Sequence, residues 1–155
     1  MISNNDILRR LRFAFDLNDD TMMRTFALAD TPATRAEISA WLKRDEDPDF
    51  VGMSDRQLAT FLNGFINLKR GKREGEQPEP ENRLNNNLIL RKLRIALNLT
   101  DDDLVAILDL ADMKVSKAEL GAFFRNPKQP QYRPCKDQIL RYFLKGLQLK
   151  YRSDV

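Results

Sequence analysis

The chain has 155 residues, a formal net charge of +3 and no histidine. The absence of histidine excludes Ser-His-Asp and Cys-His catalysis, histidine general acid–base chemistry and histidine-containing metal sites. The single cysteine, Cys135, cannot form an intrachain disulfide or a cysteine-rich metal site.

One segment occurs twice along the chain. Asn4 corresponds to Asn86, and the same offset of 82 residues holds without a gap over residues 4–70 and 86–152. About 24 of the 67 aligned positions are identical, which indicates an internal repeat. We therefore divide the chain into a first repeat (1–71), a Pro/Glu-rich linker (72–84) and a second repeat (85–152). A unit of this size has a small core, so the two repeats are expected to pack together.

The first predicted helix runs from Asn5 to Asp16, with Asn5 as its N-cap. The second begins after Asn18, and its counterpart in the second repeat begins after Thr100; acidic residues follow both caps. Such starts are typical of helices, because carboxylates in the first turn interact favourably with the helix dipole.

The third helix is predicted from a capping box, Thr34 with Glu37, which recurs as Ser116 with Glu119. The fourth begins after Ser54 in the first repeat and near Asp137 in the second.

Glycines at equivalent positions inside the fourth helices, Gly64 and Gly146, indicate a close helix–helix approach. The prolines and glutamates of the linker predict an extended, solvated connection. No strand pattern is present. The sequence thus predicts an all-α protein: two tandem four-helix repeats packed about a pseudo-two-fold axis, with helix-turn-helix-like pairs within each repeat.

Paired carboxylates, Asp19 with Asp20 and Asp101 with Asp102, are candidates for cation binding or acid–base chemistry. They follow helix N-caps, where acidic residues are expected in any case, so we favour a capping role. The sequence contains no phosphate-binding glycine loop, no Gly-x-Ser-x-Gly and no Cys-x-x-Cys. We therefore predict no enzymatic activity, no cofactor, no metal and no small-molecule substrate.

Cys135 lies between two cations, Arg133 and Lys136, that could lower its pKa and make the thiol reactive. Its counterpart in the first repeat is Met53, which favours a packing role instead.

Arginines recur on the first helix of each repeat, and this group consists of Arg9, Arg12, Arg91 and Arg94. Guanidinium groups three positions apart share a helix face and could bind phosphates, or they could pair with nearby acids. Helices two and three have the rhythm of a helix-turn-helix, in which Arg35 and Lys117 would lead the third helices into the major groove. Glu37 and Glu119 would oppose such contacts with phosphates.

The loops after the third helices carry opposite charge. Residues 43–55 have a net charge of −3, whereas residues 125–137 have a net charge of +3. The basic loop contributes the candidate binding residues Arg125, Lys128, Arg133 and Lys136. The two loops could attract each other within or between molecules, or the basic loop could contact an anionic partner. Drift between two solvated loops is the alternative.

No apolar run is long enough to span a membrane, and the first residues lack the features of a signal peptide. Together with the free thiol, this predicts a cytoplasmic protein without membrane contact.

The sequence resembles the YehS-like family of small bacterial proteins, a domain of unknown function. The resemblance covers almost the whole chain and is carried by Asn5-Asp6-Ile7-Leu8-Arg9 with Leu11-Arg12, Phe61-Leu62-Asn63-Gly64-Phe65-Ile66 with Lys69-Arg70-Gly71-Lys72, Asn86-Asn87, Leu93-Arg94-Ile95-Ala96, and residues 135–147. It implies a cytoplasmic bacterial protein with a tandem helical repeat and brings no known activity.

From these patterns we predict a non-enzymatic binding module for a protein partner or for itself. The alternative is a regulatory nucleic-acid-binding protein that uses its basic helix faces.

Overall fold

The structure is a computed structural model, and it describes residues 2–152. These residues form eight α-helices and no strand, which confirms the prediction of an all-α fold in two four-helix repeats. The first repeat contains α1 (Asn4–Ala14), α2 (Asp19–Leu28), α3 (Arg35–Leu42) and α4 (Asp55–Arg70). The second contains α5 (Asn86–Leu97), α6 (Asp101–Leu110), α7 (Lys117–Phe123) and α8 (Asp137–Tyr151).

Local sequence signals set most helix starts. The predicted capping boxes form at both third helices, where the hydroxyl groups of Thr34 and Ser116 accept from the amide three residues on. Asn18 caps α2, as predicted. The prediction that Asn5 caps α1 was wrong. Ser3 holds that position, and Asn5 is a buried residue of the first turn.

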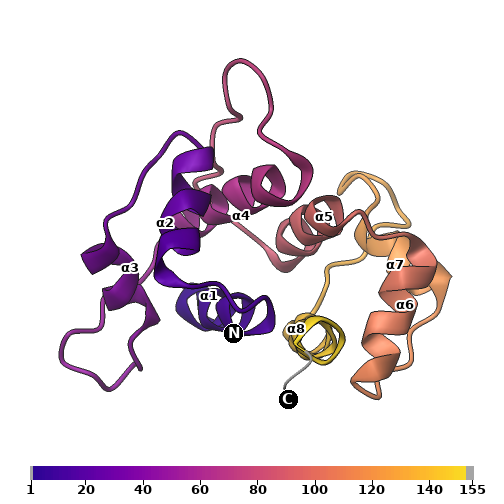
Figure 1. The fold of residues 1–155 in the computed structure, drawn as a ribbon. Coiled ribbons are helices and arrows are strands. Elements are labelled where there is room, and N and C mark those ends of the chain that lie inside the picture. The colour runs from indigo at the N-terminus through magenta and orange to yellow at the C-terminus, as the bar shows by residue number, and fades with distance from the viewer. Residues whose placement is uncertain (1, 153–155) are drawn as a thin grey trace.

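The two repeats pack through their first and fourth helices, each on the other repeat (Figure 1). α4 lies along α5, and α1 lies along α8, so that each pair joins the fourth helix of one repeat to the first helix of the other. The pairs run parallel, because the ends of the helices meet: Arg152, after α8, donates to the carbonyl of Phe13 in α1 at 2.8 Å. Packing of each first helix on the fourth helix of the other repeat gives the pseudo-two-fold relation, and it buries leucines of both first helices in one core.

Close approach at the fourth helices confirms the interpretation of their glycines. A Cβ atom at Gly64 would lie 1.8 Å from the carbonyl oxygen of Thr25 in α2. A Cβ atom at Gly146 would lie 2.1 Å from the carbonyl oxygen of Ile107 in α6. α2 and α6 thus lie directly on the backbones of α4 and α8, and only glycine fits at these two positions.

Most residues of the linker are exposed, in agreement with the prediction of a solvated connection, but side chains on α4 hold the segment at several points. It leaves α4 at Gly71 and returns to the start of α5 (Figure 1). Asn67 donates to the side chain of Gln77 at 2.8 Å, and Arg56 binds three linker residues. The partners of the linker lie on helices, which is why its composition alone did not indicate them.

Candidate functional site

The paired asparagines that open each repeat are structural. In the first repeat, the amide nitrogen of Asn5 donates to the carbonyls of Trp41 and Val51 at 2.9 Å each, and its oxygen accepts from the amide of Met53 at 2.9 Å. Its side chain is thereby fully used and buried. Asn5 thus ties the end of α3 and the loop after it to α1.

Asn87 repeats the same three bonds in the second repeat. It donates to the carbonyls of Phe123 and Arg133 at 3.0 Å each and accepts from the amide of Cys135 at 2.8 Å. The preceding residue, Asn86, donates to the carboxylate of Asp137 at 2.8 Å. This bond lowers the pKa of Asp137. The most recognisable motif of the sequence therefore positions the loops after the third helices.

The arginines shared by the two repeats make mostly internal contacts. Arg9 donates to the carbonyl of Lys43 at 2.7 Å and pairs with Asp45 at 3.2 Å. Its twin, Arg91, donates to the carbonyl of Phe124 at 3.1 Å. Each thus holds the chain that leaves the third helix.

The second position of the pattern differs between the repeats. Arg94 pairs with Asp101 at 3.0 Å and lies over the ring of Phe124, 4.6 Å from its centroid. Arg12 is half-buried on α1. The structure does not gather these four arginines into one surface, because α1 and α5 belong to different helix pairs.

The cationic residues at the start of the third helices form ion pairs with acidic residues of the second helices. Arg35 binds Asp20 at 2.9 Å and approaches Asp19 at 3.7 Å. Lys117 binds Asp102 at 2.6 Å, and this bond raises the pKa of Lys117. In the predicted helix-turn-helix geometry, these cations would first have to leave their carboxylates.

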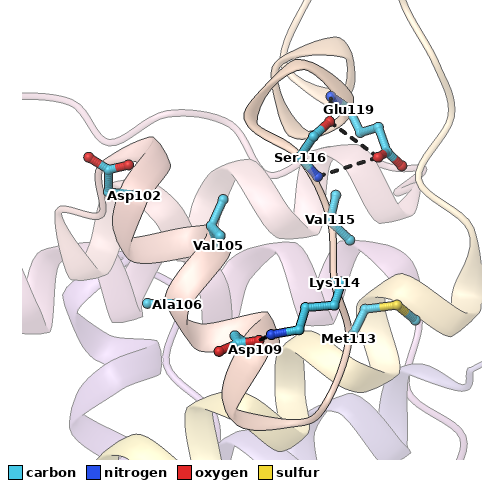
Figure 2. Close-up of a pocket in the computed structure, with 9 residues that line it drawn as sticks. All are labelled: Asp102, Val105, Ala106, Asp109, Met113, Lys114, Val115, Ser116 and Glu119. Atoms are coloured by element: carbon cyan, nitrogen blue, oxygen red, sulfur yellow. Dashed lines mark hydrogen bonds and ion pairs between the residues drawn. The ribbon is translucent and has the colours of Figure 1, made fainter.

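A surface hollow with a volume of about 570 Å³ lies between α6 and α7. Figure 2 shows Asp102 and Asp109 at separate points along α6, with Glu119 across the hollow on α7. Each carboxylate has an internal partner, since Asp109 pairs with Lys114 and Glu119 completes the capping box. Among the described residues, no three acidic or cysteine side chains are grouped to hold a metal ion.

Cys135 is buried, with 5% of its surface exposed. Burial raises the pKa of its thiol to about 12, and the nearby carboxylate of Asp137 adds to this effect. The neighbouring cations thus do not activate the thiol, and the packing interpretation agrees with its position.

The two oppositely charged loops lie on opposite flanks of the molecule (Figure 1). Attraction between them within one molecule is therefore excluded. In the acidic loop, Asp45 forms an ion pair with Arg9. In the basic loop, Arg133 folds back onto the carbonyls of Pro130 and Tyr132 at 2.8 Å each.

The remaining three cations of the basic loop are exposed, and none pairs with an acidic side chain within residues 2–152: Arg125, Lys128 and Lys136.

A small apolar hollow of about 330 Å³ lies at the base of the basic loop. Its apolar lining comes from α7, α8 and the loop between them, namely Ala122, Phe123, Pro134 and Ile139. Arg133, Lys136 and Glu119 supply its polar part. Sequence periodicity did not reveal this apolar hollow beside Lys136, because its walls come from three separate segments.

Sequence reasoning also missed a groove between α1 and α8. We call it the α1–α8 groove; its volume is about 440 Å³ and its lining is Arg10, Gln138, Arg141, Tyr142 and Lys145. The available signal was a comparison of the repeats: Arg141 and Lys145 stand where the first repeat has Ala59 and Asn63.

None of the helices within residues 2–152 combines the length and apolarity that a membrane span requires. The fold and its surfaces define a duplicated, all-helical repeat protein. The family described as "Protein of unknown function (DUF1456)" matches the chain twice, over residues 4–71 and 86–153, and the chain belongs to this family. It is 44% identical over 145 residues to "Uncharacterized protein YehS" of Escherichia coli (strain K12), and the alignment covers 93% of each protein. No solved structure matches the chain.

Proposed function

We propose that this protein is a non-enzymatic module that binds an acidic protein partner through the basic loop of its second repeat. One observation carries the proposal: Lys136 and Arg133 line an apolar hollow at the start of α8, and the same loop carries two further exposed cations, Arg125 and Lys128. Protein interfaces combine an apolar centre with a polar rim, and basic rims speed the encounter with acidic partners. The first repeat carries acidic residues in the equivalent loop, so only one end of the molecule offers this surface.

The other chemically interesting groups support a binding role. The carboxylates around the hollow between α6 and α7 have internal partners, and the buried thiol has a raised pKa. A nucleic-acid-binding role through the helix faces is the competing interpretation. It is less well supported, because Arg9 and Arg91 bind backbone carbonyls and Lys117 binds Asp102.

The proposal is tested by chemical cross-linking in cell extract, with identification of the proteins joined to the loop. The variant Lys128→Glu/Lys136→Glu reverses two loop charges, and Arg24→Glu/Arg44→Glu makes the same charge change at exposed sites in the first repeat. We expect the loop variant to lose its captured partner and the control variant to keep it. Equal capture by both variants would refute the proposal.

A gel-shift series with DNA and RNA separates the competing role. Retardation that falls steeply with salt would support nucleic-acid binding instead. Retardation that persists in the loop variant would place that binding on the helix faces, and retardation that disappears would place it on the basic loop. Light scattering on the same samples shows whether the captured partner is a second copy of this chain.

A further inference from the structure

The pseudo-two-fold axis gives the protein two related grooves, and its own linker fills one of them. The filled groove lies between α4 and α5, and we call it the α4–α5 groove. Arg56 on α4 donates to Glu79 at 2.8 Å, to the carbonyl of Pro80 at 3.1 Å and to Asn82 at 3.0 Å. Across the groove, Lys92 on α5 pairs with Glu81 at 3.0 Å. The linker thus bridges the two helices with alternating glutamates.

Coverage by the linker changes the exposure of the groove residues. The side chain of Lys92 is only 12% exposed, and Asn63, whose oxygen accepts from Lys92 at 2.6 Å, is 8% exposed. At the end of the linker, the amide of Leu84 donates to the carboxylate of Asp55 at 2.8 Å, which fixes the segment to the start of α4. The contacts show how this fold holds an extended acidic segment.

The α1–α8 groove is the symmetry-related counterpart, position by position. With the offset of 82 residues, Arg10 corresponds to Lys92, and Gln138 corresponds to Arg56. Both residues line the α1–α8 groove, and no segment within residues 2–152 fills it as the linker fills its counterpart. The position equivalent to the buried Asn63 is here the exposed Lys145.

The open groove is also more basic than the filled one. Arg141 and Lys145 are exposed on α8, one helical turn apart, and neither has an ion pair within 4 Å among the described residues. Arg10 lies opposite them on α1 and shares its charge with Asp6 at 2.9 Å. Cations therefore stand on both walls, as Arg56 and Lys92 do in the filled groove. An acidic segment would satisfy charges on both walls at once.

We infer that the α1–α8 groove binds an extended, proline-containing acidic segment of a partner protein, in the way that the α4–α5 groove binds the linker. The inference rests on the proposed role in protein binding and adds to it a second contact, distinct from the basic loop. The linker supplies the chemistry of the ligand: glutamates on either side of a proline, which keeps the chain extended at low entropic cost. Carboxylate pairing at an exposed site gives weak, salt-sensitive binding that strengthens when the basic loop binds the same partner.

The test uses the full-length protein and a fluorescent peptide with the sequence of residues 76–82. Fluorescence anisotropy at low salt gives the affinity, and amide NMR shifts give the location. We expect saturable binding with a Kd of about 1 mM or below. A control peptide whose glutamates are replaced by glutamine should not bind. We expect the largest shifts around residues 138–145 of α8 and at Arg10.

Two variants locate the peptide. Arg141→Ala/Lys145→Ala should weaken binding roughly tenfold, because two charge-assisted contacts are lost. Arg24→Ala/Arg44→Ala removes the same charge at exposed sites of the first repeat, away from both surfaces, and should leave the affinity within about twofold. Both pairs are exposed, and circular dichroism verifies that the variants fold.

Failure of this inference is distinct from failure of the proposed function. Peptide binding that weakens only in the loop variant would overturn the groove and leave the basic loop as the binding surface. Binding that displaces the linker, seen as shifts at Arg56 and Lys92, would also overturn it. The groove inference is also overturned if the peptide does not bind up to about 1 mM, or if the glutamine peptide binds equally well. Displacement of the peptide from the groove by an oligonucleotide would overturn it too.

Discussion

Three consecutive asparagines, Asn85, Asn86 and Asn87, have three different roles, and replacing each by alanine should give a ranked series of stabilities. Asn85 caps α5 by accepting from the amide of Leu88 at 2.8 Å. Asn86 donates to the carbonyl of Cys135 at 2.9 Å and to Asp137. Asn87 makes three bonds to the segment after α7 and is 9% exposed.

The expected magnitudes follow from the number and burial of these bonds. Loss of an N-cap asparagine costs about 1 kcal/mol of unfolding free energy. Asn86→Ala removes two half-buried bonds, which we expect to cost about 1–2 kcal/mol. Asn87→Ala leaves two carbonyls and one amide without partners, and water can reach only part of this set. A cost of about 2–4 kcal/mol is expected, reduced by a few tenths through the higher helix propensity of alanine.

Urea unfolding followed by circular dichroism measures the three free energies. For a protein of this size, the cost of Asn87→Ala corresponds to a fall of about 4–16 °C in Tm. Asn5→Ala is the matched control in the first repeat, because Asn5 makes the same three bonds, and it should behave like Asn87→Ala. If Asn87→Ala costs no more than Asn85→Ala, then the asparagine does not hold the loop as argued above.

Two further predictions concern helix packing and pH. Gly64→Ala should lower the unfolding free energy by at least about 2 kcal/mol, because the added Cβ would overlap the backbone carbonyl of Thr25. Gly121→Ala is the control: a Cβ there meets nothing within 4 Å, so the substitution should raise the unfolding free energy by up to about 1 kcal/mol. Urea unfolding that gives the reverse order would contradict the close approach of α2 to α4. The amide of Thr100 donates to Asp103 at 2.8 Å and, with the hydroxyl of Thr100, lowers the pKa of that carboxyl. Because the folded-state pKa of Asp103 lies below the unfolded value, its carboxylate stabilises the protein above the unfolded pKa, and this effect is lost as the pH falls through the folded pKa. The stabilities of wild type and Asp103→Asn should therefore differ near neutral pH and converge in acid. A difference that persists in acid would argue against an electrostatic origin.

The packing of each first helix on the fourth helix of the other repeat makes the two repeats depend on each other. α4 packs on α2 of its own repeat and on α5 of the other, and α8 does the same with α6 and α1. An isolated repeat would expose the faces that these pairs bury. The linker adds to the asymmetry, since it covers one pair and leaves the other open.

Local signals predicted the helices well, and they failed where a residue served a distant partner. Thr34 and Ser116 form capping boxes because both partners lie within one turn. Asn5 was predicted to be a cap from its type and place, but its side chain is taken by Trp41, Val51 and Met53. Nothing in the local sequence distinguishes a capping asparagine from a buried one.

The sequence by itself determined the duplication, the all-helical fold, the capping of most helices and the opposite charges of the two loops. These are properties of composition, periodicity and offset, so they can be compared without knowing which helices touch. The tertiary structure decided which charged side chains form ion pairs and which stay exposed. Arg35 and Lys117 are paired with acids of the preceding helices, the linker glutamates are held by Arg56 and Lys92, and the cations of the α1–α8 groove are left uncovered. The pairing of a charge depends on helices that are distant in sequence, and α1 meets α8 only when the whole chain has folded.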